Sequence, residues 1–163
     1  MLGSLRCKIE KPVEEINIMV KVFTSSVINA HIDKVWMKIR DFNALPNWHS
    51  AIANSSIENG EPSDKVGCIR NFNLKEGGNI RERLLSLSDL DYFYSYLILE
   101  SPMPFKNYIA TLQLRPITDG DLTYAEWTAI FDCDSQEEQN LIKLVGDGVF
   151  QTGFNSLNQI FME

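Results

Sequence analysis

The hydrophobic pattern is most distinctive in the last stretch of the chain, Glu137 to Met162. Its polar residues are spaced four, four and three positions apart, which draws one narrow stripe along an α-helix: Asp147, Gln151, Asn155 and Asn158. More than half of the remaining circumference is apolar, whereas a surface helix usually has an apolar stripe of only ~100°. We therefore expect another part of the chain to wrap around this helix.

Small residues lie among the apolar ones in the same stretch, namely Gly146, Gly148, Thr152, Gly153 and Ser156. Gly costs ~1 kcal/mol relative to Ala inside a helix, so these positions need a physical reason. Small residues on a buried face either allow another backbone to approach or leave space unfilled. The pattern alone leaves both possibilities open, and the second would create room for a ligand.

The rest of the chain consists mainly of short runs that alternate with period two and end at turn signals. A first strand begins at Val20, a helix runs to Arg40 with its cap within Asn29 to Asp33, and a helical turn covers Phe42 to Trp48. Six further strands are predicted over 50–59, 66–74, 80–87, 92–99, 107–116 and 122–132. Short loops imply antiparallel neighbours. The predicted fold is α+β, with a seven-stranded antiparallel sheet curled around the long C-terminal helix and two short helices between the first two strands.

Length and charge narrow the function classes. The 163 residues suit one domain, with 1–18 as an N-terminal extension and 19–163 as a ligand-binding domain. The net charge of −7 argues against nucleic acid and against an anionic membrane surface. No apolar run reaches the ~18–20 residues that span a bilayer, so membrane insertion is not expected.

Cysteine and histidine usage bears on compartment and metals. Cys7, Cys68 and Cys133 form no CxxC pair, and the N-terminus lacks the long apolar core of a secretory signal, so a reduced, cytoplasmic setting is expected. His31 and His49 have no metal-ligand spacing to these cysteines. We therefore expect no metal and no cofactor, in a monomer or a homodimer.

The order of elements resembles the helix-grip fold of the Bet v 1-like or START-like (SRPBCC) superfamily, in its polyketide cyclase/dehydrase branch. The stretches that carry the resemblance are AHIDKVWMKIRDFNALPNWHSAI, VGCIRNFNLKEGGNIRERLLSLSD, YFYSYLILESPMPFKNYIATL, YAEWTAIFD and VFQTGFNSLNQIF. Together they cover roughly Val20 to Phe161. The segments GCIR, ERL and KNY and the final helix are also similar to plant abscisic acid receptors.

The resemblance implies an internal cavity for an apolar small molecule, but not one reaction, because members include cyclases, lipid carriers and hormone receptors. By analogy with the receptors, the loops Lys75 to Asn79 and Pro102 to Lys106 would cover the cavity mouth. The first loop lacks the receptors' Ser-Gly-Leu-Pro-Ala pattern, and the second lacks their His-Arg-Leu. Ala53 stands where the receptors place a lysine for the ligand's carboxylate. These differences argue against hormone sensing of that kind.

Two charged residues are predicted inside the cavity. Strand alternation places Arg70 on the apolar face with Cys68 and Phe72. The next strand is ambiguous by hydrophobicity, and the family's ERL pattern places Glu82 inside. The two residues would lie on adjacent antiparallel strands and pair, because a lone buried charge is very costly. Such a pair is either structural, or a polar contact for a ligand, or a catalytic group with Glu82 as general acid or base.

The other candidates are neutral side chains. His49 would lie near the cavity rim, as a structural residue beside Trp48 or as a ligand contact. Tyr96 and Tyr108 either pack as core rings or point a hydroxyl inward. The remaining predicted wall residues are Phe72, Trp127, Phe131, Val145, Val149 and Gly153.

Three functional hypotheses follow from these residues. The first is binding of an apolar or aromatic small molecule, of lipid-, polyketide- or hormone-like type, between the sheet and the C-terminal helix. The second is a cyclase or dehydrase in which Glu82 moves a proton and Arg70 stabilises developing negative charge. The third is a ligand-gated module that recruits another protein.

Overall fold

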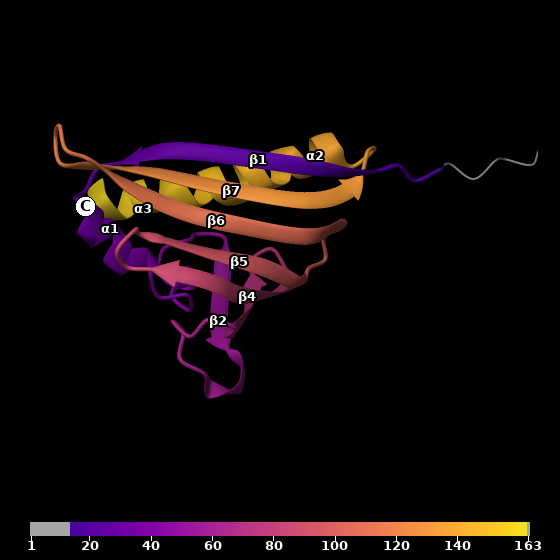
Figure 1. Ribbon diagram of the computed structural model, residues 1–163, viewed down its shortest axis with the longest axis horizontal. Helices are drawn as coiled ribbons and strands as arrows, with labels where there is room; N and C mark the ends of the chain where they lie inside the picture. Colours follow the sequence, from indigo (N-terminus) through magenta and orange to yellow (C-terminus); the bar gives the residue numbers. More distant parts are fainter. Residues whose placement is uncertain (1–13, 163) are drawn as a thin grey trace, which may run out of the picture.

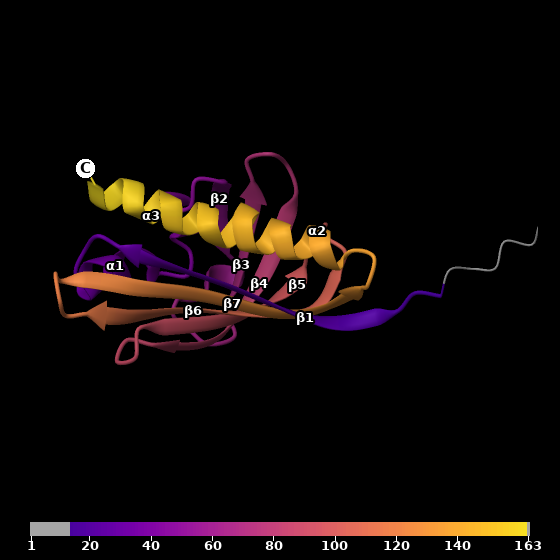
Figure 2. The same cartoon turned by 90° about the horizontal axis from the view of Figure 1, so that it is seen from above.

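The computed structural model describes residues 14–162, so Cys7 and most of the predicted N-terminal extension lie outside the described residues. One antiparallel sheet of seven strands, in the order β1-β7-β6-β5-β4-β3-β2, curls around a long C-terminal helix. Figure 1 shows the curl of the sheet, and Figure 2 shows the helix lying across one sheet face. The predicted helix-grip architecture is confirmed.

The strands are β1 (Asn17–Ile28), β2 (Ile52–Ile57), β3 (Ile69–Leu74), β4 (Asn79–Ser88), β5 (Phe93–Glu100), β6 (Phe105–Ile117) and β7 (Leu122–Asp134). β1 begins before the predicted Val20, because Asn17 already pairs with Asp134 at the end of β7. β3 begins after the predicted Val66, whose side chain is exposed and precedes Gly67 with a φ of +95°.

The short helices are α1 (Ile32–Ile39) and the single turns η1 (Leu45–Asn47) and η2 (Glu58–Gly60). His31 is the N-cap of α1, and its Nδ1 accepts a hydrogen bond from the Asp33 amide at 3.1 Å. The buried face of α1 has helical spacing, with Val35 and Ile39 fully buried. The two helices predicted before the second strand are therefore present, the second as a 3₁₀ turn. The second strand was predicted to run to residue 59, but it ends at Ile57 because η2 begins at Glu58.

The C-terminal helix is continuous but not uniform. It consists of α2 (Glu138–Lys143), a π-helical segment η3 (Leu144–Gln151) and α3 (Thr152–Met162). The expectation of one regular α-helix is thus corrected at its middle third. Phe150, Phe154 and Leu157 are fully buried against the sheet. The ring of Phe150 stacks on that of Trp127 in β7, with 4.6 Å between centroids.

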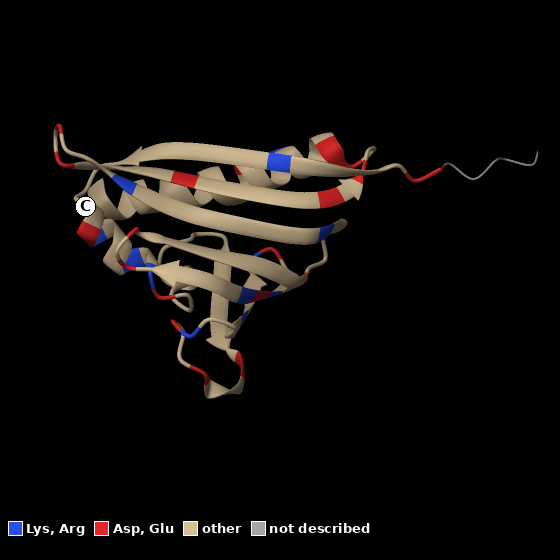
Figure 3. Cartoon of the chain, in the orientation of Figure 1, with Lys and Arg blue, Asp and Glu red and all other residues tan. Residues whose placement is uncertain are grey.

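Charged residues are distributed over the described chain with both signs interspersed (Figure 3). Most lie on loops, strand ends and the solvent face of the sheet, where Arg81 pairs with Glu58 and Glu100. Among residues 14–162, no helix is both long and apolar enough to cross a membrane.

Candidate ligand-binding site

A cavity of about 320 Å³ lies between the inner face of the sheet and the π-helical segment η3. Apolar side chains form most of its wall, among them Leu45, Ile52, Phe72, Leu74, Ile80, Ile98, Met103, Phe105, Trp127, Leu144, Val145 and Val149. Its polar lining residues are His49, Ser50, Arg70, Lys75, Glu76, Glu82, Tyr96 and Tyr108. The wide apolar girth of the helix therefore serves two purposes, since one part packs on the sheet and another faces this hollow.

The most polar point of the cavity is the pair of Arg70 on β3 and Glu82 on β4. The two residues are direct partners in the β3–β4 register, so period-two alternation turns both side chains to the inner face. Arg70 is 1% exposed and Glu82 is 4% exposed. Arg70 Nε donates to Glu82 Oε2 at 2.7 Å, and Nη2 lies 2.6 Å from the same oxygen.

The guanidinium of Arg70 is held from further sides. Its Nη1 donates to the Phe42 carbonyl at 2.9 Å. Its Cζ lies 3.9 Å from the centroid of the Phe42 ring and 5.0 Å from that of Tyr96, within the range of cation–π attraction. The turn that contains Phe42, between α1 and η1, and the strands β4 and β5 thus fix the orientation of the Arg70 side chain.

Opposing effects set the protonation of the pair. Burial raises the pKa of the Glu82 carboxyl, and the charge and hydrogen bonds of Arg70 oppose that rise. Burial acts to lower the pKa of Arg70, but Glu82, Tyr94 and Tyr96 together more than offset it, and the pKa lies above its ordinary value. Both contacts use Oε2, and no described residue hydrogen-bonds to Oε1. Oε1 is therefore free to meet a group in the cavity.

Two tyrosines stand beside this pair. Trp127 Nε1 donates to the Tyr96 hydroxyl oxygen at 3.1 Å, which leaves the hydroxyl hydrogen of Tyr96 to point elsewhere. The Tyr108 hydroxyl has no hydrogen-bond partner among the described residues. Burial, and after it the negative charge of Glu82, raises the pKa of both tyrosines well above the ordinary value. Both hydroxyls keep their protons near neutral pH and can donate.

Both ring nitrogens of His49, at the edge of the cavity, have hydrogen-bond partners in the protein. Its Nε2 donates to the Val149 carbonyl of η3 at 2.8 Å, and its Nδ1 accepts from the Ala51 amide at 3.3 Å. A carbonyl can only accept and an amide N–H can only donate, so these partners define the neutral tautomer with the proton on Nε2. Burial lowers the pKa of His49, and Arg70 adds to that effect.

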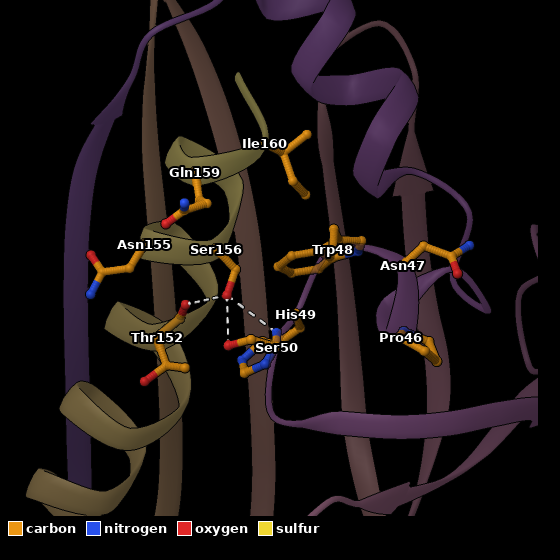
Figure 4. A pocket seen from close by; sticks show the side chains of 10 residues that line it. All are labelled: Pro46, Asn47, Trp48, His49, Ser50, Thr152, Asn155, Ser156, Gln159 and Ile160. Carbon is orange, nitrogen blue, oxygen red and sulfur yellow. Dashed lines mark hydrogen bonds between the residues drawn. The ribbon is translucent and has the colours of Figure 1, made fainter. Parts of the chain in front are cut away.

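The contact of His49 with the helix requires Gly153. A Cβ atom there would lie 2.9 Å from both His49 Cδ2 and Trp127 Cζ3. Figure 4 shows the outer side of this contact, where the loop before β2 meets α3. There Ser156 Oγ donates to the Thr152 carbonyl at 2.8 Å, accepts from the Ser50 amide at 3.2 Å and lies 2.9 Å from Ser50 Oγ. Gly153 thus allows His49 and Trp127 to approach the helix closely, whereas Gly148 borders the cavity.

Two loops border the cavity mouth, as the resemblance implied. The β3–β4 loop contributes Lys75 and Glu76 to the lining, and the β5–β6 connection contributes Met103. The loops lie against each other, since a Cβ atom at Gly78 would be 3.3 Å from Pro102 Cγ. Gly78 has a φ of +105°, a conformation that favours glycine.

The structure brings together most of the predicted site residues. His49, Arg70, Phe72, Glu82, Tyr96, Tyr108, Trp127, Val145 and Val149 line the cavity. Phe131 and Gly153 do not belong to this lining. Phe131 lies behind Tyr108, with the rings stacked at 5.6 Å, and Gly153 lies under His49 and Trp127.

Sequence reasoning missed several lining residues. Ile80 shares the inward face of β4 with Glu82, so alternation could have found it. Leu144 and Gly148 line the cavity from η3, at positions that depend on the π-helical turn. Tyr94 was not singled out either, although it lies behind the lining: its hydroxyl is buried without a partner among the described residues, and its ring contacts Phe42 and Tyr96.

Comparison with protein families gives one match over nearly the whole chain. The family described as "Polyketide cyclase / dehydrase and lipid transport" matches residues 19–161. The chain belongs to this family. A search of curated proteins found no match. None of these findings bears on the resemblance to abscisic acid receptors, which stays a prediction.

Solved structures of the same fold include bacterial proteins of similar length. The protein XoxI from Bacillus cereus is 29% identical, with a TM-score of 0.79 over 88% of this chain and 96% of that one. An uncharacterized protein from Bacillus thuringiensis is 28% identical, with a TM-score of 0.79 over 88% and 100% of the two chains. A protein from Thermobifida fusca is 28% identical, with a TM-score of 0.78 over 86% and 92%.

Proposed function

We propose that this protein binds an apolar or aromatic small molecule in the cavity between the sheet and η3. One observation carries the proposal: a buried ion pair, Arg70 and Glu82, faces an otherwise largely apolar hollow. Ligand sites are usually apolar concavities with a few convergent polar groups, and this site has that composition. The family, which is described by cyclase, dehydrase and lipid-transport functions, supports the same role.

The size of the cavity limits the ligand. Its volume of about 320 Å³ lies at the small end of the usual range for ligand pockets, ~300–1,000 Å³. A ligand of one or two fused rings, or a short chain, suits this volume better than a long acyl lipid. The aromatic rings of Phe72, Tyr108 and Trp127 favour a flat aromatic body.

The geometry supports binding over proton transfer. A general base near neutral pH requires a carboxylate that is only loosely paired. Here both contacts between Arg70 and Glu82 are short, at 2.6 and 2.7 Å. The hollow interior likewise supports a ligand role over a plain interaction module, whose core would be filled with side chains.

Naphthalene is a suitable probe of the proposal, because it is apolar, aromatic and small. We expect it to bind the purified protein, as measured by calorimetry. Gly148→Leu should weaken binding at least about tenfold by placing a side chain at the cavity wall. This variant should fold, since a Cβ atom at Gly148 meets only Leu144 Cδ1, at an ordinary 3.6 Å.

Asp147→Leu is the matched control, because Asp147 is the neighbouring residue of η3 and does not line the cavity. It should bind naphthalene like the wild type. No binding to the wild type, or equal binding to Gly148→Leu, would contradict the proposal. Native mass spectrometry of the freshly purified protein adds a direct search for a co-purified small molecule.

A further inference from the structure

The polar end of the cavity has a definite hydrogen-bonding character that goes beyond a general preference for apolar ligands. Given the proposed cavity function, on which this step rests, we propose that the preferred ligand carries a neutral hydroxyl group, as a phenol or alcohol does, at the end that reaches Glu82. Carboxylates, amines and bare hydrocarbons should be poorer ligands than the matching hydroxyl compound.

Charge is the first reason. Arg70 and Glu82 are both nearly fully buried and cancel each other's charge. Tyr96 and Tyr108 keep their protons, and the hydrogen bonds of His49 define its neutral tautomer. A carboxylate or an amine placed beside the pair would be a third buried charge without a partner, which is very unfavourable. The ligand group at this end must therefore be neutral.

Donor and acceptor balance is the second reason. Glu82 Oε1 has no hydrogen-bond partner among the described residues, and an ionised carboxylate only accepts. A ketone or an ether has no hydrogen to donate to it. The hydroxyl groups of Tyr96 and Tyr108 face the same cavity with hydrogens to donate. A ligand hydroxyl meets both needs, since it donates one hydrogen bond and accepts two.

The mouth of the cavity offers an alternative position for an anion. Lys75 is the other cationic side chain of the lining, and it belongs to the β3–β4 loop rather than to the inner sheet face. A ligand carboxylate could bind there with the ligand reversed. Lys75→Met removes this carboxylate-binding position, so that binding measures only the head group beside Arg70 and Glu82.

The test compares naphthalene, naphthol and naphthoate, which share one ring body and differ in the head group. In Lys75→Met protein, naphthol should bind at least about tenfold more tightly than either of the others, the gain expected from a hydrogen bond to a charged group. Equal affinities for naphthol and naphthalene, or tighter binding of naphthoate, would overturn the head-group assignment and leave the cavity function standing. If none of the three binds, both proposals fail.

Glu82→Gln in the Lys75→Met background should change the preference between the naphthol and naphthoate head groups, which a merely structural role of Glu82 would not do. The charge of Arg70 is then unpaired, so the ratio of naphthol to naphthoate affinity should fall at least about tenfold. Glu58→Gln is the control, because it removes one of the two carboxylate partners of Arg81 outside the cavity and should leave the ratio unchanged.

Tyr108→Phe provides a second variant if Glu82→Gln does not fold. It removes only a hydroxyl, and the Tyr108 ring still packs against the rings of Phe105 and Phe131, so the packing is kept. Naphthol should lose several-fold in affinity while naphthalene is unaffected. An unchanged naphthol affinity would contradict the donor role of this residue.

Discussion

His49 joins the loop before β2 to the C-terminal helix through Nε2, and its Nδ1 is held within the loop itself. Its Nε2 satisfies the Val149 carbonyl in the π-helical segment, and its Nδ1 accepts the Ala51 amide. Protonation of the ring would place a hydrogen on Nδ1, where the amide already donates, and would bury a charge near Arg70. The folded state therefore favours neutral His49.

The stability of the protein should depend on this histidine below its ordinary pKa of 6.5. Because folding lowers the pKa, the unfolded chain binds the proton first, and stability falls as the pH drops from 6.5 toward the lower pKa of the folded state. Between about pH 7.5 and about pH 5.5, the wild type should lose up to ~1.4 kcal/mol more unfolding free energy than His49→Gln.

Urea unfolding of both proteins at the two pH values measures this difference, and contributions from carboxyl groups largely cancel in the comparison. His31→Gln controls for the loss of a histidine at an exposed site. An equal pH dependence of the wild type and His49→Gln would show that the ring is not held neutral by its partners.

Individual inward residues were predictable where strand periodicity was unambiguous. Alternation placed Arg70 on the inner face, whereas Glu82 was placed there only by the ERL resemblance. The short hairpin then brought the two together, because neighbouring antiparallel strands with a tight turn have few possible registers. The position of Phe131 was not predictable in the same way, since alternation gives a face of the sheet but not the distance along it. Gly153 was recognised as a small residue, but only the structure distinguishes close approach from empty space.

At the scale of one element, the C-terminal helix likewise has positions that border the cavity and positions that pack closely on the sheet. A π-helical turn sets the helix register, so Leu144, Val145, Gly148 and Val149 all contribute to the cavity wall. π-Helical segments are frequently found at functional sites, which agrees with the position of η3 beside the hollow. Its Val149 carbonyl, bound by His49, shows how the surrounding fold supports the irregular turn.

Two glycines of this helix should respond in opposite ways to the same substitution. Gly153→Ala should lower the unfolding free energy by ~1–3 kcal/mol, because its Cβ would lie 2.9 Å from two rings. Gly148→Ala should raise it by up to ~1 kcal/mol through helix propensity, because its Cβ meets only an ordinary contact at 3.6 Å. Thermal or urea unfolding measures both changes. A stabilising Gly153→Ala would show that His49 and Trp127 do not pack tightly against the helix at Gly153.

Helix and strand existence could be predicted, but the π-helical turn could not. The four, four and three spacing of the polar stripe fits an α-helix, and Asp147 and Asn155 are indeed exposed. A single extra residue in one turn hardly changes such a pattern. Strand ends were shifted where a long-range partner decided them, as for β1, which begins at Asn17 because β7 extends to Asp134.

At the scale of the whole molecule, the sheet grips the helix without filling the space beside η3. The pairing of β1 with β7 joins the first strand in sequence to the last, and the hairpins from β2 to β7 complete the curl. Hairpin neighbours follow from short loops, whereas the β1–β7 pairing rests on the resemblance to a known fold. The presence of free volume is a property of all the packed side chains together, which no local pattern contains.

Proton–nitrogen correlation NMR of the tryptophan indoles during titration with naphthol tests the central claim most directly. Trp127 lines the cavity and donates its indole N–H to Tyr96, whereas Trp36 donates its own to Asp89 outside the cavity, at 2.7 Å. If naphthol binds in the cavity, the Trp127 indole signal should show a saturable shift, with little change at Trp36. An unmoved Trp127 signal, or shifts confined to Trp36, would contradict a ligand site between the sheet and the helix.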